Sequence, residues 1–379
     1  MTGSAPDLAP ARMATRLCFL AAGFAIASWA PLIPAVKHGL GLDAALFGTA
    51  LLCLGLGSVI AMPATGVVIA RAGAREVIAR TTLVAALALP CLTLAPNGWT
   101  LAACLAVFGA ALGALDVAMN VHGAEVERRE GRPLMSGFHA VFSIGALAGA
   151  MLSTLLVWAG LPIQWIAAAS ALAVFALGRL ALPGISAATA AEPTGFVLPR
   201  GVVLVLAAMV AVIFLVEGAV LDWGALLIVE RAIMDRGAAG TGFVAFSVGM
   251  VLMRLAGDAL IARSGRPGVL VTSGIVATLG FCIVLTLDDP LAVQAGFFLV
   301  GAGAACIVPI LISAAESQGV MPAGQAVAAV TAAGYGGHLL GPALVGLVAQ
   351  WTSLAFAFAL LAGMIALVSV TAVVVRNRL

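Results

Sequence analysis

The sequence predicts an all-α membrane protein of twelve spanning helices, arranged as two pseudo-symmetric six-helix bundles. Three observations indicate this fold: an apolar composition, a series of bilayer-length apolar runs, and an internal repeat. Of the 379 residues, 63% are hydrophobic and 9% are charged, whereas about 25% of the residues of a typical soluble domain are charged. Because so few charged side chains cannot cover a water-facing surface of this size, the composition excludes a soluble enzyme, a disordered chain and a nucleic-acid-binding protein.

The first half of the chain contains six apolar runs. A spanning helix needs about 20 apolar residues, and each run is close to that length. The first fifteen residues include Pro6 and Pro10 and lead directly into the first run, which indicates a short cytoplasmic tail without a cleaved signal peptide. The predicted spans are 17–36, 44–68, 77–95, 99–122, 134–158 and 162–182.

A polar stretch over 183–200, which contains Pro and Ser, separates these spans from six more. We predict a first bundle over 1–182, a cytoplasmic linker over 183–200 and a second bundle over 201–379. Glycines are frequent within the runs, and small residues let neighbouring helix backbones approach closely in a membrane. The spans of the second half are 201–229, 239–262, 268–287, 290–314, 324–349 and 352–375.

The positions of Lys and Arg predict the orientation of the chain. With the N-terminus inside, the cytoplasmic segments hold fourteen arginines, and the outer segments hold Lys37, Arg231 and Arg236. Cytoplasmic loops of membrane proteins carry an excess of basic residues. This asymmetry predicts that both termini lie in the cytoplasm, which also requires an even number of spans.

The two halves resemble each other in sequence. A shift of 192 residues aligns residues 57–73 with 249–265 and gives seven identities in seventeen positions. The same shift aligns Gly109 with Gly301 and places two further glycine pairs in register. Because one register serves three helix pairs, we predict that the two bundles are related by pseudo-symmetry. The further pairs are Gly145 with Gly337 and Gly149 with Gly341.

At the loop between the second and third spans the chain resembles the major facilitator superfamily, whose signature there is G-x-x-x-D-R-x-G-R-[RK]. The loop has Gly66, Arg71, Gly73 and Arg75 at matching positions, but Ala70 stands where the family has Asp. The equivalent stretch of the second half is a stronger copy. The resemblance implies two gating latches and alternating access around a central site near the bilayer midplane. The second latch would contain Arg254, Asp258 and Arg263.

Three segments within spans are similar to a bacterial branch of that family near the fucose-permease-type sugar symporters. They read Trp-Ala-Pro-Leu-Ile-Pro at 29–34, Leu-Asp-Val-Ala-Met-Asn at 115–120 and Glu-Gly-Ala-Val-Leu-Asp-Trp at 217–223. This similarity implies a solute transporter driven by an ion gradient.

Acidic residues inside spans need a specific reason, because an ionisable group at a helix centre costs roughly 2.5–3.5 kcal/mol on insertion scales. Asp116 and Asn120 are four residues apart and share a helix face, and Glu217 lies near the middle of its span. A carboxylate deprived of water holds its proton and releases it when water returns. We interpret Asp116 and Glu217 as proton-coupling residues. For Asp116 the alternative is a hydrogen bond to a neighbouring helix.

Histidines and aromatic residues complete the candidate site. His139 is a third proton-coupling candidate, because a carboxylate–imidazole pair suits proton relay, although its ring could instead reach toward the inner headgroups. His38 and His122 are expected at the membrane interface. Trp29 and Trp223 have two interpretations. They could stack on the solute, or they could anchor the protein at the membrane interface, which is a common role of Trp. The substrate-binding candidates are Asn120, Asp222, Trp223, Trp29, Tyr335 and His338.

We therefore expect a secondary transporter of the bacterial inner membrane that moves a small polar solute, such as a sugar, by proton-coupled symport. A proton-coupled efflux antiporter for drugs or metabolites is the alternative. The expected partners are the solute, protons and the bilayer, with no nucleic acid, and the protein is expected to act as a monomer. We expect no cofactor and no metal, because the six cysteines form no Cys-x-x-Cys pair. An enzyme is not expected, since the sequence shows no nucleophile–base pair and no metal-ligand cluster. ATP-driven transport is not expected, because no phosphate-binding G-x-x-x-x-G-K-[ST] loop is present.

Overall fold

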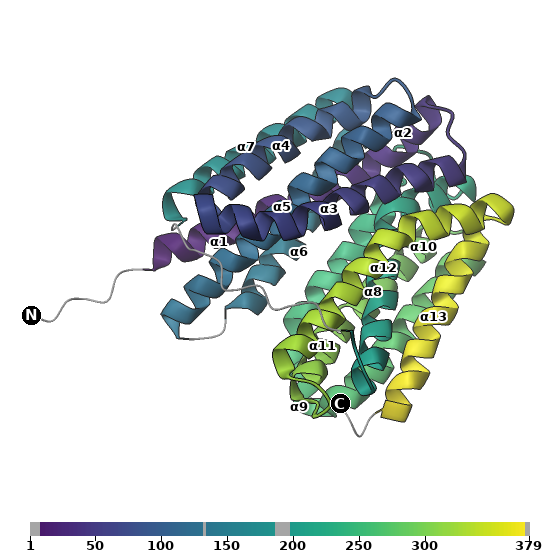
Figure 1. The fold of residues 1–379 in the computed structure, drawn as a ribbon. Coiled ribbons are helices and arrows are strands. Elements are labelled where there is room, and N and C mark those ends of the chain that lie inside the picture. The colour runs from purple at the N-terminus through teal and green to yellow at the C-terminus, as the bar shows by residue number, and fades with distance from the viewer. Residues whose placement is uncertain (1–7, 132–133, 186–197, 376–379) are drawn as a thin grey trace, which may run out of the picture.

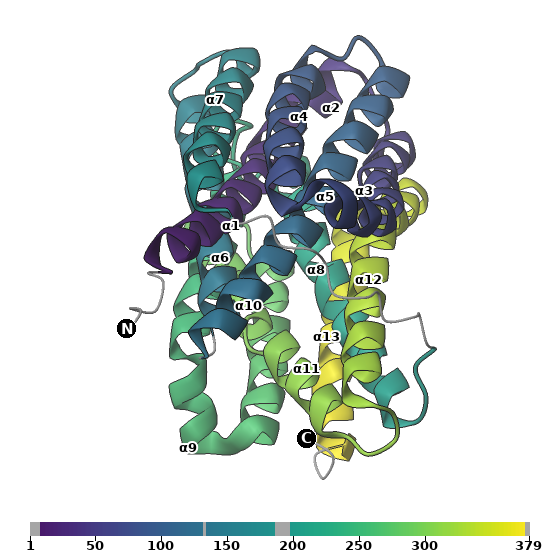
Figure 2. The same cartoon turned by 60° about the vertical axis from the view of Figure 1, so that its left-hand side comes forward.

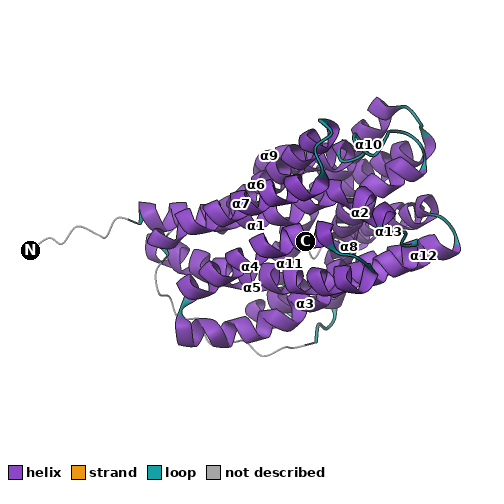
Figure 3. Cartoon of the chain, turned by 90° about the horizontal axis from the view of Figure 1, so that it is seen from above, coloured by secondary structure: helices purple, strands orange, loops and turns teal. Residues whose placement is uncertain are grey.

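The computed structural model describes residues 8–131, 134–185 and 198–375. Every secondary-structure element in these ranges is a helix (Figure 3). In a bilayer each backbone polar group must find a partner within the protein, and a helix provides these partners locally. The first half contains α1 (Ala9–Trp29), η1 (Ala30–Leu32), α2 (Ile33–Gly39), α3 (Ala44–Ala72), α4 (Ala74–Leu94), α5 (Gly98–Glu130), α6 (Met135–Trp158), α7 (Ile163–Ala181) and η2 (Leu182–Gly184).

In the second half, one long helix is bent and one predicted span is divided. α9 changes direction at Gly265, whose φ of 71° and ψ of 159° are not helical. The predicted span over 290–314 corresponds to two consecutive helices. The elements are α8 (Val202–Glu230), α9 (Thr241–Thr286), α10 (Pro290–Ala304), α11 (Ile307–Ser317), α12 (Ala323–Trp351) and α13 (Leu354–Val375).

Among the described residues, eleven helices are long and apolar enough to cross a membrane. A shorter apolar helix, Thr241–Gly257, corresponds to the predicted span over 239–262. Large apolar side chains such as Ile60 and Leu87 stay exposed, at 72% and 62% of their area, as expected where lipid replaces water. The prediction of a helical membrane protein is confirmed, whereas the count of twelve spans and the orientation of the termini stay predictions.

The helices form two groups, α1–α7 and α8–α13, which Figure 1 colours purple to teal and green to yellow. Contacts between the groups are made chiefly by α3 with α12 and by α6 with α9. Since successive helices run in opposite directions, Ala9 and Val375 lie on one side of the molecule, here called the terminal side. The turns at 40–43, 159–162 and 231–240 lie on the other, here called the opposite side. The predicted linker lies largely outside the described residues.

The two groups approach each other most closely toward the opposite side. A Cβ atom on Gly48 of α3 would lie 2.8 Å from the carbonyl oxygen of Pro342 and 3.1 Å from the Cα of Gly346, both on α12. Only glycine permits this separation of backbones. Figures 1 and 2 show the helix ends of the terminal side spread apart, so the pair of groups opens toward that side.

Glycines pack the same helix pair in each half. In the first half, a side chain on Gly57 would clash with the carbonyl oxygen of Ala106, and one on Gly109 with that of Leu54. These contacts join α3 to α5. Small residues at such crossings allow the tight backbone packing on which helix association in lipid depends. In the second half the equivalent contacts join Gly249 to Phe298 and Gly301 to Phe246.

The turns that follow these helices also match. Gly73 has φ 81° and ψ 157°, and Gly265, 192 residues later, has φ 71° and ψ 159°. Residues with a Cβ rarely adopt a positive φ, so both turns require glycine. The repeat seen in the sequence therefore corresponds to a repeated backbone structure.

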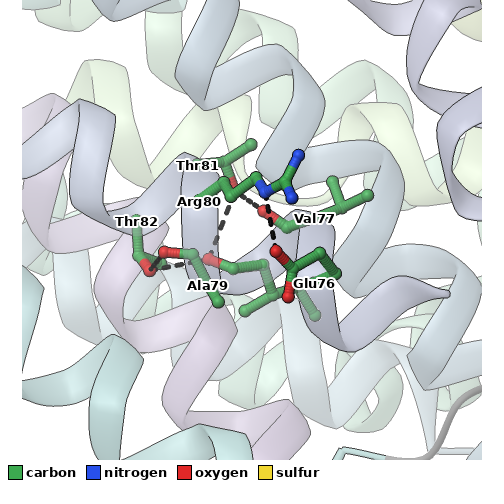
Figure 4. A network of polar contacts seen from close by, with 7 residues as sticks. Glu76, Val77, Ala79, Arg80, Thr81 and Thr82 are labelled. Carbon is green, nitrogen blue, oxygen red and sulfur yellow. Dashed lines mark hydrogen bonds and ion pairs between the residues drawn. The ribbon is translucent and has the colours of Figure 1, made fainter. Parts of the chain in front are cut away.

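On α4, directly after the first of these turns, polar side chains find partners on their own helix (Figure 4). The Thr81 hydroxyl donates to the Val77 carbonyl at 2.8 Å. Arg80 Nε donates to Glu76 Oε1 at 2.7 Å, and both residues are exposed. Such internal partners let polar residues stand in a helix that faces lipid.

Candidate functional site

A cavity of about 270 Å³ lies between the two helix groups. Its wall is formed by α1, α3, α5 and α6 from one group and by α8, α9 and α12 from the other. Much of the lining is apolar, including Ile26, Phe142, Phe214 and Leu339. The ionisable side chains that line it are Asp116, His139, Glu217, Arg254, Tyr335 and His338.

Asp116 is bonded to both helix groups. The Tyr335 hydroxyl of α12 donates to Asp116 Oδ2 at 2.6 Å, a distance typical of a charge-assisted O–H···O⁻ bond. The Asn120 amide, one turn along α5, donates to Asp116 Oδ1 at 3.2 Å and to the Asp116 carbonyl at 2.8 Å. The predicted shared face of Asp116 and Asn120 is confirmed, and Tyr335 links this pair to the second half.

Arg254 makes a second link between the groups. Its guanidinium Nη1 donates to the Ser143 hydroxyl of α6, and it lines the cavity together with Glu217 and His139. Arg254 and Glu217 thus form the charged part of the cavity in the second half. The resemblance assigned Arg254 to a loop latch; the structure instead places it in the cavity.

The two cavity histidines lie on opposite groups. His139 of α6 lies edge-on to the Phe19 ring, with ring centroids 5.1 Å apart, and it lines the cavity. His338 of α12 has Nδ1 3.4 Å from the Phe214 carbonyl oxygen. Among the other histidines, His122 was expected at the membrane interface, but it is fully buried with its Nδ1 2.9 Å from the Thr15 hydroxyl. A polar partner on α1 allows this burial, and the depth of His122 relative to the membrane interface stays a prediction.

Four of the predicted substrate-binding residues lie outside the lining of this cavity. Asn120 bonds to Asp116 behind the lining. Trp29 is fully buried, Asp222 is 6% exposed and Trp223 is 1% exposed. Trp223 packs edge-on against Phe47 with ring centroids 5.6 Å apart, at the close approach of α3 and α12. Sequence position placed these residues in the correct helices, but the side chains of Trp29, Asp222 and Trp223 point away from the cavity.

The latch residues of the first half lie on the terminal side. Arg71 and Arg75 are exposed on either side of the Gly73 turn, and Arg263 is exposed in the equivalent position before Gly265. Gly66 has open space around it. The Asp258 side chain lies outside the described residues, so its predicted pairing with Arg254 stays a prediction.

Ser143 was not predicted from the sequence. It lies four residues after His139 and therefore on the same helix face, and this spacing is the signal that could have identified it. Its hydroxyl donates to the His139 carbonyl at 3.2 Å and accepts from Arg254. A small polar residue next to a candidate histidine thus connects the two groups.

The comparison with family models and known proteins agrees with this architecture. Residues 17–229 match the model of the Major Facilitator Superfamily. An uncharacterised MFS-type transporter of Yersinia pestis is 42% identical over 365 residues, which cover 95% of this chain and 94% of that protein. The chain belongs to the Major Facilitator Superfamily. It is therefore a multi-pass membrane protein of a transporter family.

Solved structures of this superfamily share the fold. A variant of the nucleoside transporter NupG aligns with a TM-score of 0.76 and 14% identity, covering 96% of this chain and 99% of that chain. A D-xylose–proton symporter aligns with a TM-score of 0.75 and 13% identity, covering 96% of each chain. In major facilitator proteins the substrate site lies between the two bundles near the bilayer midplane, and the cavity described above lies between the corresponding helix groups.

Proposed function

We propose that this protein moves a small polar solute, a sugar or sugar-like metabolite, across the bacterial inner membrane by proton-coupled symport. The observation that supports this most strongly is the Tyr335–Asp116 hydrogen bond. It joins the two helix groups at a carboxylate that lines the cavity between them. A proton that binds or leaves Asp116 therefore changes a contact between the groups.

Two carboxylates would couple protons to movement. Asp116 stands on α5 and Glu217 on α8, so each half gives one acid to the cavity. A carboxylate in an apolar surrounding holds a proton when dry and releases it when water enters. Glu217 has the Arg254 guanidinium within electrostatic range, which gives its ionised form a stabilising partner. His139 would relay protons on the first-half side.

The solute would bind among the same side chains. In the lining, Tyr335 and His338 offer donors and acceptors, and Phe142 and Phe214 offer apolar faces. Asn120 holds Asp116 from one turn further along α5 and would reach the solute only next to that carboxylate. Ligand pockets combine a mostly apolar lining with a few placed polar groups in this way. A volume of about 270 Å³ suits a solute smaller than a typical drug.

If the termini lie in the cytoplasm as predicted, the proposed mechanism has the terminal side facing inward. The route to the outside would then be closed where Gly48 meets Pro342 and Gly346. Transport would require this contact to separate while the helix ends of the terminal side come together, as in rocking of one bundle against the other. The latch residues Arg71, Arg75 and Arg263 would act at that closing side.

A proton-coupled efflux antiporter is the second candidate. The apolar part of the lining, with Leu54, Met62 and Leu112 beside the aromatic residues, favours it because amphipathic compounds bind apolar walls. A thermal-shift screen of the purified protein separates the two candidates. Stabilisation by sugars alone supports the symporter, and stabilisation by amphipathic drugs alone supports the antiporter.

Neutralising either acid tests the coupling. We expect Glu217→Gln and Asp116→Asn each to abolish accumulation of solute against its gradient in proteoliposomes, because neither variant can release a proton. Exchange of pre-loaded solute should stay measurable, since it needs no net proton movement. Glu316→Gln serves as the matched control, because Glu316 is exposed on α11 away from the cavity. Uphill transport that continues unchanged in both acid variants would refute the assignment.

A further inference from the structure

A second pocket lies on the opposite side of the molecule, where the two groups meet. It has a volume of about 290 Å³ and is lined by residues of α2, α3, α8, α12 and α13 and of the turns beside them. No residue lines both this pocket and the central cavity. We call it the outer pocket. Its lining consists of Pro34, Lys37, His38, Gly41, Leu42, Ala44, Trp223, Leu226, Val229, Glu230, Arg236, Ala349 and Leu354.

Positive charge gathers in the outer pocket although it is rare on this side. The opposite-side turns and the helix ends beside them contain three basic residues, Lys37, Arg231 and Arg236. Arg231 has a structural use, because it donates to the Val284 carbonyl, to the Leu287 carbonyl at 3.3 Å and to Asp288 Oδ1 at 2.6 Å. The two remaining cations both line the outer pocket.

Lys37 and Arg236 have no hydrogen-bond or ion-pair partner among the described residues, and His38 beside them is exposed. The pocket contains one acidic side chain, Glu230, which is also exposed. Cations that serve only solubility are usually spread over a surface. Here they converge from both helix groups on one hollow, which leaves it with a net positive charge.

Trp223 provides a buried donor in the wall of the same pocket. Its side chain is 1% exposed, and its indole Nε1–H has no hydrogen-bond partner within the described part of the chain. Buried Trp N–H groups usually have a partner, and an unsatisfied one carries a desolvation cost. The pocket wall beside Trp223 is apolar, with Pro34, Leu42 and Leu226.

We propose that the outer pocket binds a small organic anion, with a carboxylate or phosphate between Lys37 and Arg236 and an apolar body against Trp223. Both cations attract the acidic group, and Trp223, whose buried Nε1–H has no partner among the described residues, forms part of the wall beside them. A volume of about 290 Å³ is at the lower end of the range for ligand pockets, so the ligand is small. This site is separate from the central cavity and does not depend on the transport mechanism proposed above.

Titration calorimetry of the purified protein with benzoate tests the proposal, with benzamide as the uncharged isostere. Benzoate should bind and benzamide should bind at least tenfold more weakly. Lys37→Gln and Arg236→Gln should each weaken benzoate binding about fivefold, as for a partly exposed ion pair, and Lys37→Arg should retain it. Trp223→Phe keeps an aromatic ring without the N–H and should also weaken binding.

Glu230→Gln provides a variant whose effect cannot result from misfolding. It removes the only acidic side chain of the outer pocket, so benzoate should bind about fivefold more tightly. Equal binding of benzoate and benzamide, or affinities unaffected by Lys37→Gln and Glu230→Gln, would overturn the proposal.

The acidic group could also belong to a lipid. Native mass spectrometry of protein released from phosphatidylglycerol nanodiscs distinguishes this source. A bound phosphatidylglycerol that is lost in Lys37→Gln and displaced by benzoate would assign the outer pocket to a lipid phosphate. Benzoate binding without a retained lipid supports the soluble anion, and the absence of both overturns the site.

Discussion

The two halves of the chain use the same glycines for packing but contribute different chemistry to the cavity. Gly109 lies against the Leu54 carbonyl, and Gly301, its repeat partner, lies against the Phe246 carbonyl. Asp116 follows Gly109 on α5, whereas the position 192 residues after it is Val308. Close approach of two helices is needed in both halves, so the glycines are retained in both. In the proposed mechanism one acid from each half serves the cavity, so the repeat partner of Asp116 can be apolar.

The same asymmetry holds for the basic residue. Arg254 lines the cavity from α9, and Met62, its repeat partner on α3, also lines it. Two facing cations would repel each other in this low-dielectric region. A further pair of repeat partners differs in residue type, but both residues still form hydrogen bonds. Tyr335 and Ser143 are repeat partners, and each makes a hydrogen bond to the other helix group.

The largest expected effect tests whether the glycine-mediated helix contacts are equally important in the two halves. Gly109→Val and Gly301→Val should each lower the free energy of unfolding by about 3 kcal/mol, because the added side chain would force two packed helices apart. Thermal or denaturant unfolding in detergent measures this. Gly363→Ala on α13 is the control, because a Cβ there meets no atom within 4 Å and alanine favours a helix over glycine by roughly 0.5–1 kcal/mol. If one of the two valine variants unfolded like the unsubstituted protein and the other were destabilised, the two halves would not be equivalent in packing.

A smaller effect should distinguish the two hydrogen bonds between the groups. Tyr335→Phe removes a donor to ionised Asp116, a bond worth about 1.5–3 kcal/mol. The ionised carboxylate loses stabilisation, so we expect the pH of half-maximal uptake to rise by about one unit. Ser143→Ala also removes a bond between the groups but does not touch Asp116, so it should lower uptake without moving this midpoint. Equal midpoints in the two variants would mean that Tyr335 only holds the helices together.

The smallest effect concerns the two turns with positive φ. Gly73→Ala and Gly265→Ala should each destabilise the protein by about 1 kcal/mol, because a Cβ strains the left-handed backbone. The two losses should agree within error, since φ and ψ nearly coincide at the two positions. Parallel unfolding curves of the two variants measure this. Clearly different losses in the free energy of unfolding would show that the two turns contribute differently to stability.

The sequence alone determined which segments are helical spans and that the halves repeat. Bilayer thickness sets the length of an apolar run, so the predicted runs coincide with helices. Two runs are divided, 17–36 among α1, η1 and α2 and 290–314 between α10 and α11, and the runs 239–262 and 268–287 are both part of α9. The spacing of Asp116 and Asn120 also fixed their shared face, because helix geometry alone decides it. The glycine register predicts the pseudo-symmetry of the two halves, because it serves three helix pairs.

Only the tertiary structure decided which way each span is rotated. A spanning helix is apolar toward lipid and toward its neighbours alike, so its sequence carries little periodic signal to show which face is inside. For this reason Trp223 could not be assigned to the outer pocket, nor Arg254 to the central cavity. The bond from Tyr335 to Asp116 joins residues 219 positions apart. It exists because packing of the two halves brings α12 beside α5, a relation that no local pattern encodes.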